Sequence, residues 1–133
     1  MVKPISLNVK CRSCGKSLMD YKKKLHDFPS IACDIEVGGK KGKLWLCSIY
    51  GCYDHESTMD MKKGELVTFT CPHCHDELNS EIICKLCDGR MVKFDIEIGG
   101  IVSICSRVGC TNHYVMFEDL ADALRKYHAE YDA

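Results

Sequence analysis

Cys11-Arg-Ser-Cys14 opens a cysteine pattern that the chain carries twice. The first copy continues with Asp34-Ile-Glu-Val-Gly-Gly39 and Cys47-Ser-Ile-Tyr-Gly-Cys52. The second copy contains, in the same order, Cys71-Pro-His-Cys74, Asp95-Ile-Glu-Ile-Gly-Gly100 and Cys105-Ser-Arg-Val-Gly-Cys110. Paired thiols at fixed spacing, repeated within one short chain, are typical of a structural metal site that is built twice.

The composition favours a metal over disulfides. The chain has 133 residues and 11 cysteines, a density that also permits a disulfide scaffold. The number of cysteines is odd, however, and the first residues lack the apolar run of a signal peptide. Cys-x-x-Cys pairs in such a chain indicate reduced thiolates on a metal. We therefore expect a cytoplasmic protein, and the absence of any run near 18 apolar residues predicts no membrane span.

The stretches between the cysteines predict strands. Residues 31–37 and 91–98 alternate apolar and polar side chains, as half-buried strands do. Each stretch runs into a Gly-Gly turn and then into a second apolar segment, 43–46 or 101–104, which ends at a cysteine. A hairpin that presents two cysteines opposite a Cys-x-x-Cys turn is the layout of a zinc ribbon.

The predicted fold is a small, metal-stabilised, β-rich protein with two β-hairpin units, tandem zinc ribbons, and a C-terminal α-helix. The first unit is expected over 1–58, a linker over 59–66 and the second unit over 67–133. Units of about 60 residues bury too little apolar surface to be stable alone, so each needs a metal. The helix, at about 117–131, is predicted from apolar residues at helical spacing: Phe117, Leu120, Ala121, Leu124, Tyr127 and Tyr131.

Tetrahedral zinc takes four nitrogen or sulfur ligands, and two residues between two cysteines let one tight turn supply two of them. Pairs present in both copies are expected to share an ion. This predicts a first site from Cys11, Cys14, Cys47 and Cys52, and a second site from Cys71, Cys74, Cys105 and Cys110.

Cys84-Lys-Leu-Cys87, found only in the second copy, leaves the pairing open. The matching stretch of the first copy is Lys23-Lys-Leu-His26, where one ligand type survives as histidine. In one alternative, Cys71, Cys74, Cys84 and Cys87 form a compact ribbon, and Cys105 and Cys110 pair with His113. In the other, Cys84 and Cys87 pair with Cys105 and Cys110, while Cys71 and Cys74 go elsewhere. Two zinc ions are predicted, with room for a third, and iron is the alternative metal.

Three further residues have a weaker claim to the metal. His55 and His113 follow the last cysteine of each copy as Cys-x-x-His, and they are either additional ligands or histidines that recur because the copies share ancestry. Cys33 has no partner at ligand spacing and lies in a predicted strand. It is expected to be a buried, small apolar residue.

The cysteine pattern resembles the four-cysteine zinc ribbons at the C-terminus of bacterial type I topoisomerases. The resemblance rests on Cys11-x-x-Cys-Gly-x-x-Leu followed by Gly42-Lys-Leu-Trp-Leu-Cys47-Ser-Ile-Tyr-Gly-Cys52. Cys84-x-x-Cys-Asp-Gly-Arg-Met-Val through Cys105-Ser and Cys110 is similar too. Those ribbons bind single-stranded DNA, so the resemblance implies a zinc-ribbon fold and nucleic-acid binding as one candidate function.

Charge separates the remaining function classes. Residues 1–65 hold 12 Lys and Arg against 8 Asp and Glu, whereas residues 66–133 hold 6 against 11. A near-neutral chain with an apolar helix favours a non-enzymatic interaction protein, an adaptor or small accessory subunit with a protein partner. The basic first half keeps nucleic acid as the alternative partner, and iron–thiolate electron transfer is a third class. No hydrolytic constellation, phosphate-binding loop or small-molecule site is evident, so no enzyme is predicted.

Overall fold

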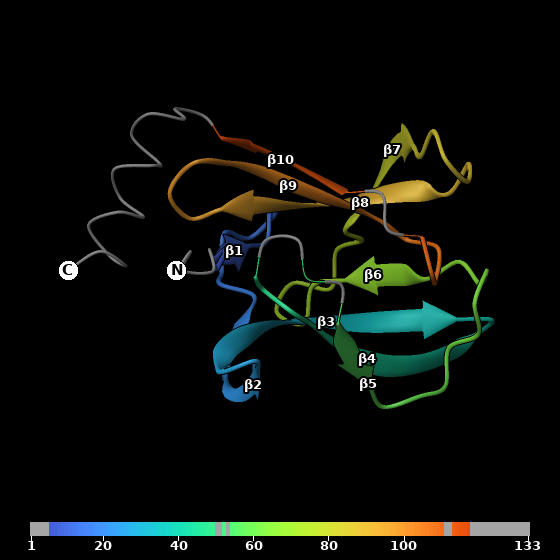
Figure 1. Cartoon of the computed structure of the whole chain (residues 1–133), viewed down its shortest axis with the longest axis horizontal. Coiled ribbons are helices and arrows are strands. Elements are labelled where there is room, and N and C mark those ends of the chain that lie inside the picture. Colours follow the sequence, from blue (N-terminus) through green and yellow to red (C-terminus); the bar gives the residue numbers. More distant parts are fainter. Residues whose placement is uncertain (1–5, 50–51, 53, 111–112, 118–133) are drawn as a thin grey trace.

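The computed structural model describes residues 6–49, 52, 54–110 and 113–117, and these residues form two five-stranded antiparallel sheets (Figure 1). The strands are β1 (Val9–Lys10), β2 (Met19–Leu25), β3 (Phe28–Val37), β4 (Lys40–Leu46), β5 (His55–Ser57), β6 (Thr68–Thr70), β7 (Asn79–Ile83), β8 (Arg90–Ile96), β9 (Gly100–Cys105) and β10 (His113–Phe117). The sequence prediction of a β-rich chain is confirmed. None of the described residues belongs to a helix, so none forms a helix that could cross a membrane.

Each sheet is built around one long hairpin, and the repeated Asp-Ile-Glu motif lies at the end of its first strand, just before the turn. In the first sheet the order is β2-β3-β4-β5, and β6 also pairs with β3. Gly38 and Gly39 connect β3 to β4 with φ values of 57° and 84°. A two-residue turn with positive φ at both positions matches the twist of the strands and suits glycine. The second sheet repeats this plan as β7, β8, β9 and β10.

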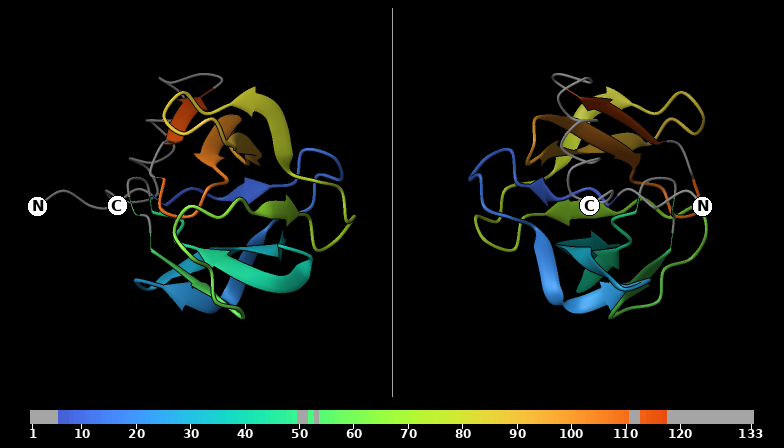
Figure 2. Two further views of the ribbon diagram at one scale, coloured as in Figure 1. Left: turned by 90° about the vertical axis from the view of Figure 1, so that its right-hand side faces the viewer. Right: turned by 60° about the vertical axis from the view of Figure 1, so that its left-hand side comes forward.

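The two halves of the chain exchange a strand. β1, from the first half, pairs with β8 in the second sheet, with Val9 opposite Ile96. β6, from the second half, pairs with β3 in the first sheet, with Phe69 opposite Ile35. The exchange is reciprocal, because each half gives one strand to the sheet of the other half. β1 and β6 also each lead directly into the first cysteine of a repeat. In Figure 2, β1, drawn in blue, lies at the boundary between the two layers.

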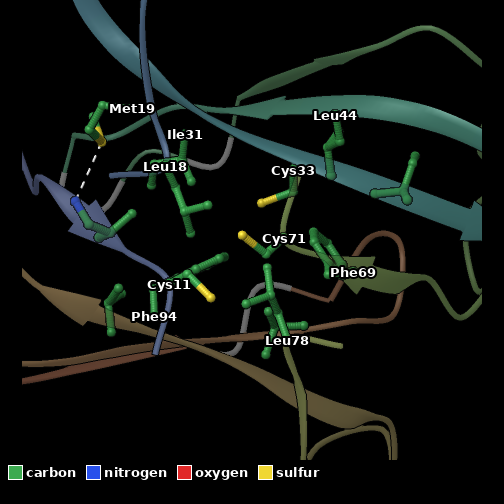
Figure 3. Packing of buried hydrophobic residues seen from close by; sticks show 14 of the residues in the cluster. Cys11, Leu18, Met19, Ile31, Cys33, Leu44, Phe69, Cys71, Leu78 and Phe94 are labelled. Atoms are coloured by element: carbon green, nitrogen blue, oxygen red, sulfur yellow. Dashed lines mark hydrogen bonds between the residues drawn. The ribbon is translucent and has the colours of Figure 1, made fainter. Parts of the chain in front are cut away.

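One hydrophobic core therefore serves both sheets. It contains Ile31 and Ile35 from the first sheet together with Phe94 and Val102 from the second, all at most 6% exposed. Figure 3 shows Cys11 and Cys71 among buried apolar side chains of this core, such as Leu18 and Phe94. A much smaller cluster of Cys84, Met91 and Cys105 lies apart from this core.

The structure corrects the predicted fold in two respects. The chain is not a tandem of self-contained ribbons, since each sheet takes one strand from the other half. The unit boundaries 1–58 and 67–133, with the linker 59–66, stay a prediction about the repeat in the sequence. The helix predicted to begin at Phe117 is wrong at its start, because Phe117 is the last residue of β10. The rest of that prediction, 118–131, lies outside the described residues.

Candidate metal centres

Three Cys-x-x-Cys turns, beginning at Cys11, Cys71 and Cys84, share one backbone geometry. In each, the amide N–H two residues after the first cysteine points at its sulfur, with N···S distances of 3.3, 3.3 and 3.4 Å. The amide four residues after the first cysteine donates to its carbonyl at 2.9 Å in all three turns. The residue after the second cysteine has a positive φ, 74° at Gly15, 64° at His75 and 62° at Asp88. Each turn therefore directs two sulfurs to one point and supplies N–H donors that stabilise thiolates.

Two of these turns meet at the boundary between the sheets. Cys11, Cys14, Cys71 and Cys74 bring their four sulfurs within 4.8 Å of one another. Cys11 Sγ lies 3.7 Å from Cys74 Sγ, and Cys14 Sγ lies 3.8 Å from Cys71 Sγ. Zinc–sulfur bonds of about 2.3 Å in a tetrahedron place the sulfurs about 3.8 Å apart, whereas a disulfide bond is about 2.05 Å. The spacing therefore fits a four-thiolate metal site; we call these residues the shared centre.

Burial and hydrogen bonds act against each other on the thiols of the shared centre. Cys11 and Cys71 are fully buried, while Cys14 and Cys74 lie closer to the solvent. Burial raises the pKa of Cys11, but the amide groups of Cys14 and Ser13 and hydrogen bonds with neighbouring thiols outweigh it, so the pKa lies below its usual value. Burial leaves the pKa of Cys71 above its usual value. Four thiolates packed this closely repel one another, and a divalent cation would remove that repulsion.

The third turn forms a second four-sulfur group with the end of β9. Cys84, Cys87, Cys105 and Cys110 also lie within 4.8 Å of one another. Cys84 Sγ is 3.8 Å from Cys110 Sγ, and Cys87 Sγ is 3.2 Å from Cys105 Sγ. The first distance matches a tetrahedral edge, and the second is shorter by roughly half an ångström. We call this group the peripheral centre, since it belongs to the small cluster outside the main core.

The pairing differs from the one that the repeat suggested. Cys11 and Cys14 lie with Cys71 and Cys74, not with Cys47 and Cys52, and the compact ribbon of Cys71, Cys74, Cys84 and Cys87 is absent from the described residues. The alternative that joins Cys84 and Cys87 to Cys105 and Cys110 has the geometry found here. The cause is the strand exchange: β1 and β6 carry both leading cysteine pairs to the boundary between the sheets, away from the hairpin that follows each in sequence.

Cys47 and Cys52 form a third group with a histidine that sequence reasoning left out of its ligand list. The ligand atoms of His26, Cys47 and Cys52 lie within 4.8 Å of one another. Alignment of the two copies contains a signal for this ligand, since His26 occupies the position that Cys87 has in the second copy. His26 Nε2 also lies 2.6 Å from Asp54 Oδ2.

Comparison with models of protein families, with curated proteins and with solved structures finds no match. The candidate metal sites are therefore defined by their own geometry.

The remaining candidates lie outside these groups. His55 is exposed in β5, and no three-residue group that the described residues form includes it. His113 is the first residue of β10, and its side chain lies outside the described part. Cys33 is fully buried in β3, as predicted; its sulfur points toward Cys71 among apolar side chains (Figure 3), and burial raises its pKa.

Both four-cysteine groups have the donor chemistry of a closed structural site. Four thiolates complete the coordination of zinc and leave no position for a substrate. Such a site stabilises the fold because the ion binds the folded chain far better than the unfolded one. The chain can therefore hold metal at two places, one joining the sheets and one supporting the turn between β7 and β8.

Proposed function

We propose that this chain is a zinc-stabilised, non-enzymatic interaction protein that binds a partner protein through a surface beside the peripheral centre. Closed four-thiolate groups support a structural role for the metal. The sulfur spacings of 3.2 to 3.8 Å support reduced thiols, which agrees with a cytoplasmic location. We prefer zinc to iron because Zn²⁺ has no redox chemistry, and a structural ion needs none.

Four exposed apolar side chains in and beside the third turn carry the proposal. Leu86, between the two cysteines of the third turn, is 73% exposed, and Ile82 and Ile83 in β7 are 44% and 51% exposed. Leu66, 52% exposed, packs beside the same turn, since a Cβ on Gly89 would lie 3.2 Å from its Cδ2. We call these four residues the apolar rim. Exposed apolar side chains concentrated in one part of the chain favour a protein interface there.

The backbone beside the apolar rim supports the same partner class. Among the described residues β7 pairs only with β8, so it is an edge strand of the second sheet. An exposed edge strand with apolar side chains can accept a strand from another protein. Nucleic acid has no peptide backbone that could pair with this edge strand.

Nucleic acid is the second candidate, supported by the exposed lysines of the first sheet. Lys22 and Lys24 in β2 are exposed beside Tyr21, and β4 adds further exposed lysines. Trp45, however, is a poor stacking platform: its indole N–H donates to Asp20 at 3.1 Å, and the Lys23 ammonium lies 5.4 Å from its ring centroid. Lys23 also forms a salt bridge with Glu56, so part of the basic surface is neutralised.

The test compares capture by the native chain with capture by the double variant Ile82→Ser/Leu86→Ser. The matched control is Tyr21→Ser, which removes an exposed apolar side chain from the other sheet. We expect a discrete protein to bind the native chain and the control and to be lost from the double variant by at least tenfold, about 1.4 kcal/mol. Equal capture by all three would contradict the proposal. Binding of single-stranded DNA or RNA that falls steeply with salt would favour the alternative.

Metal identity is tested separately. Elemental analysis and a visible spectrum of anaerobically purified protein should give zinc and no colour. Stoichiometric iron with thiolate charge-transfer bands would instead support electron transfer.

A further inference from the structure

We propose that His26, Cys47 and Cys52 form a third metal site, which takes a divalent thiophilic cation such as Zn²⁺ and exchanges it more readily than the two four-cysteine centres. The three ligand atoms lie within 4.8 Å of one another although the residues come from the β2–β3 turn and the segment after β4. We call this group the mixed centre. It is independent of the proposed partner binding.

The mixed centre occupies the same place in the first sheet as the peripheral centre in the second. Cys47 and Cys52 follow β4 as Cys105 and Cys110 follow β9. The amide of Cys52 donates to a carbonyl three residues earlier at 3.0 Å, and Cys110 does the same at 3.1 Å. The backbone that positions two thiols of a four-cysteine centre is therefore retained here.

The hairpin opposite these thiols has been shortened. The Cys84–Cys87 turn of the second sheet is replaced by a two-residue connection, His26 and Asp27, with φ values of 54° and 70° between the paired residues Leu25 and Phe28. This tight turn projects a single donor, the imidazole, toward the two thiols. Lys23 stands where Cys84 stands in the second copy, and an ammonium group has no lone pair for a metal. Three of the four ligands remain, with one cysteine exchanged for histidine.

Asp54 holds the imidazole in place. Its Oδ2 lies 2.6 Å from His26 Nε2, although both side chains are more than half exposed, at 68% and 54%. A carboxylate on one ring nitrogen orients a metal-binding histidine and increases the basicity of the other nitrogen. The backbone carbonyl of Asp54 also accepts a hydrogen bond from the amide of Cys47 at 2.9 Å, which ties the carboxylate to the thiol segment. A simple surface ion pair would need neither this link nor the two thiols.

The coordination is incomplete, which makes the ion exchangeable. Two thiolates and one imidazole fill three positions of a tetrahedron and leave the fourth to water or a small ligand. Cys47, Cys52 and Asp54 line a cavity of about 200 Å³ whose walls include apolar side chains of both sheets, such as Ile31 and Val102. The side chains of His26 and Asp54 are more than half exposed, so solvent or a chelator can reach the mixed centre from their side.

The test is a zinc titration of the full-length, reduced chain against a chromophoric chelator. We expect three equivalents in the native chain, two tight and one weaker. His26→Ala should lose only the weaker equivalent, by at least 100-fold in affinity, while Asp54→Asn should weaken it 10- to 100-fold. His73→Ala is the matched control, an exposed histidine beside the shared centre that should keep all three equivalents.

Several outcomes would overturn the mixed centre. These are a native chain that holds two equivalents, a His26→Ala variant that keeps three, or loss of the third in His55→Ala instead. If His26→Ala fails to retain the two tightly bound ions, a cobalt titration of the native chain provides the test instead. The third Co²⁺ should add thiolate charge-transfer absorption weaker, per ion, than that of the first two, and a third Co²⁺ without such absorption would refute the site.

Discussion

Gly15 and His75 occupy the same position in the two turns of the shared centre, yet only one of them is a glycine. Both have a left-handed backbone, with φ of 74° and 64°. This conformation costs a residue with a Cβ about 1–2 kcal/mol. The turn at His75 therefore carries strain that the turn at Gly15 avoids, and the hydrogen bonds to Cys71 oppose it.

We predict that Gly15→Ala lowers the free energy of unfolding by about 1 kcal/mol through this backbone strain alone. A Cβ at Gly15 would meet nothing within 4 Å, so a steric clash does not contribute. His75→Ala is the control, because it exchanges one residue with a Cβ for another and should change stability by less than about 0.5 kcal/mol. Thermal unfolding at fixed free zinc measures both. Equal losses in the two variants would show that the φ angle does not govern these turns.

At the scale of elements, local features could be read from the sequence and long-range pairing could not. The alternation in 31–37 and the Gly38-Gly39 turn depend only on neighbours along the chain, and β3 and β4 follow them. The two-residue β1, in contrast, carries no periodicity, and its partner β8 begins some 80 residues later. The repeat suggested that cysteines of one copy share an ion, and the exchange of β1 and β6 reverses that for the leading pairs. His26 was not predicted as a ligand because it replaces a cysteine in a turn that no longer has the Cys-x-x-Cys pattern of the second copy.

The exchange predicts that the two halves of the chain need each other. Fragments 1–62 and 63–133 should each lack half of the shared centre and one strand of a sheet. We expect an equimolar mixture with zinc to form a one-to-one complex that binds one more ion than the separated fragments together. Size-exclusion chromatography with metal analysis measures this, and Cys74→Ser in the second fragment should abolish the gain. Two fragments that fold separately as monomers with their full metal content would contradict the exchanged topology.

For the whole molecule, the two four-cysteine centres differ in how much structure depends on them. The shared centre includes Cys11 and Cys71, members of the core that joins both sheets, whereas the peripheral centre belongs to a cluster of three buried residues. Loss of the ion from the shared centre should therefore destabilise the whole molecule, whereas loss from the peripheral centre should destabilise only the structure around it.

We predict that Cys74→Ser lowers the thermal midpoint by roughly 10 °C or more, since it removes about 3 kcal/mol or more of metal-derived stability from the common core. Cys87→Ser is a matched substitution at a similarly half-buried thiol. It should lower the midpoint by less than half as much and increase hydrogen exchange mainly in β7 and the start of β8. If Cys87→Ser destabilises the molecule as strongly as Cys74→Ser, the division into a shared and a peripheral centre is wrong.

The separation of the shared cysteines along the chain also matters during synthesis. Cys14 and Cys71 are 57 positions apart, so at about 5–20 residues per second the ribosome needs roughly 3–11 s to deliver the second pair after the first. Throughout that interval Cys11 and Cys14 are a dithiol without their eventual partners, open to oxidation or to binding a metal with thiols of another nascent chain. We therefore expect translation speed and the zinc supply near the ribosome to influence how much of this protein reaches its native pairing.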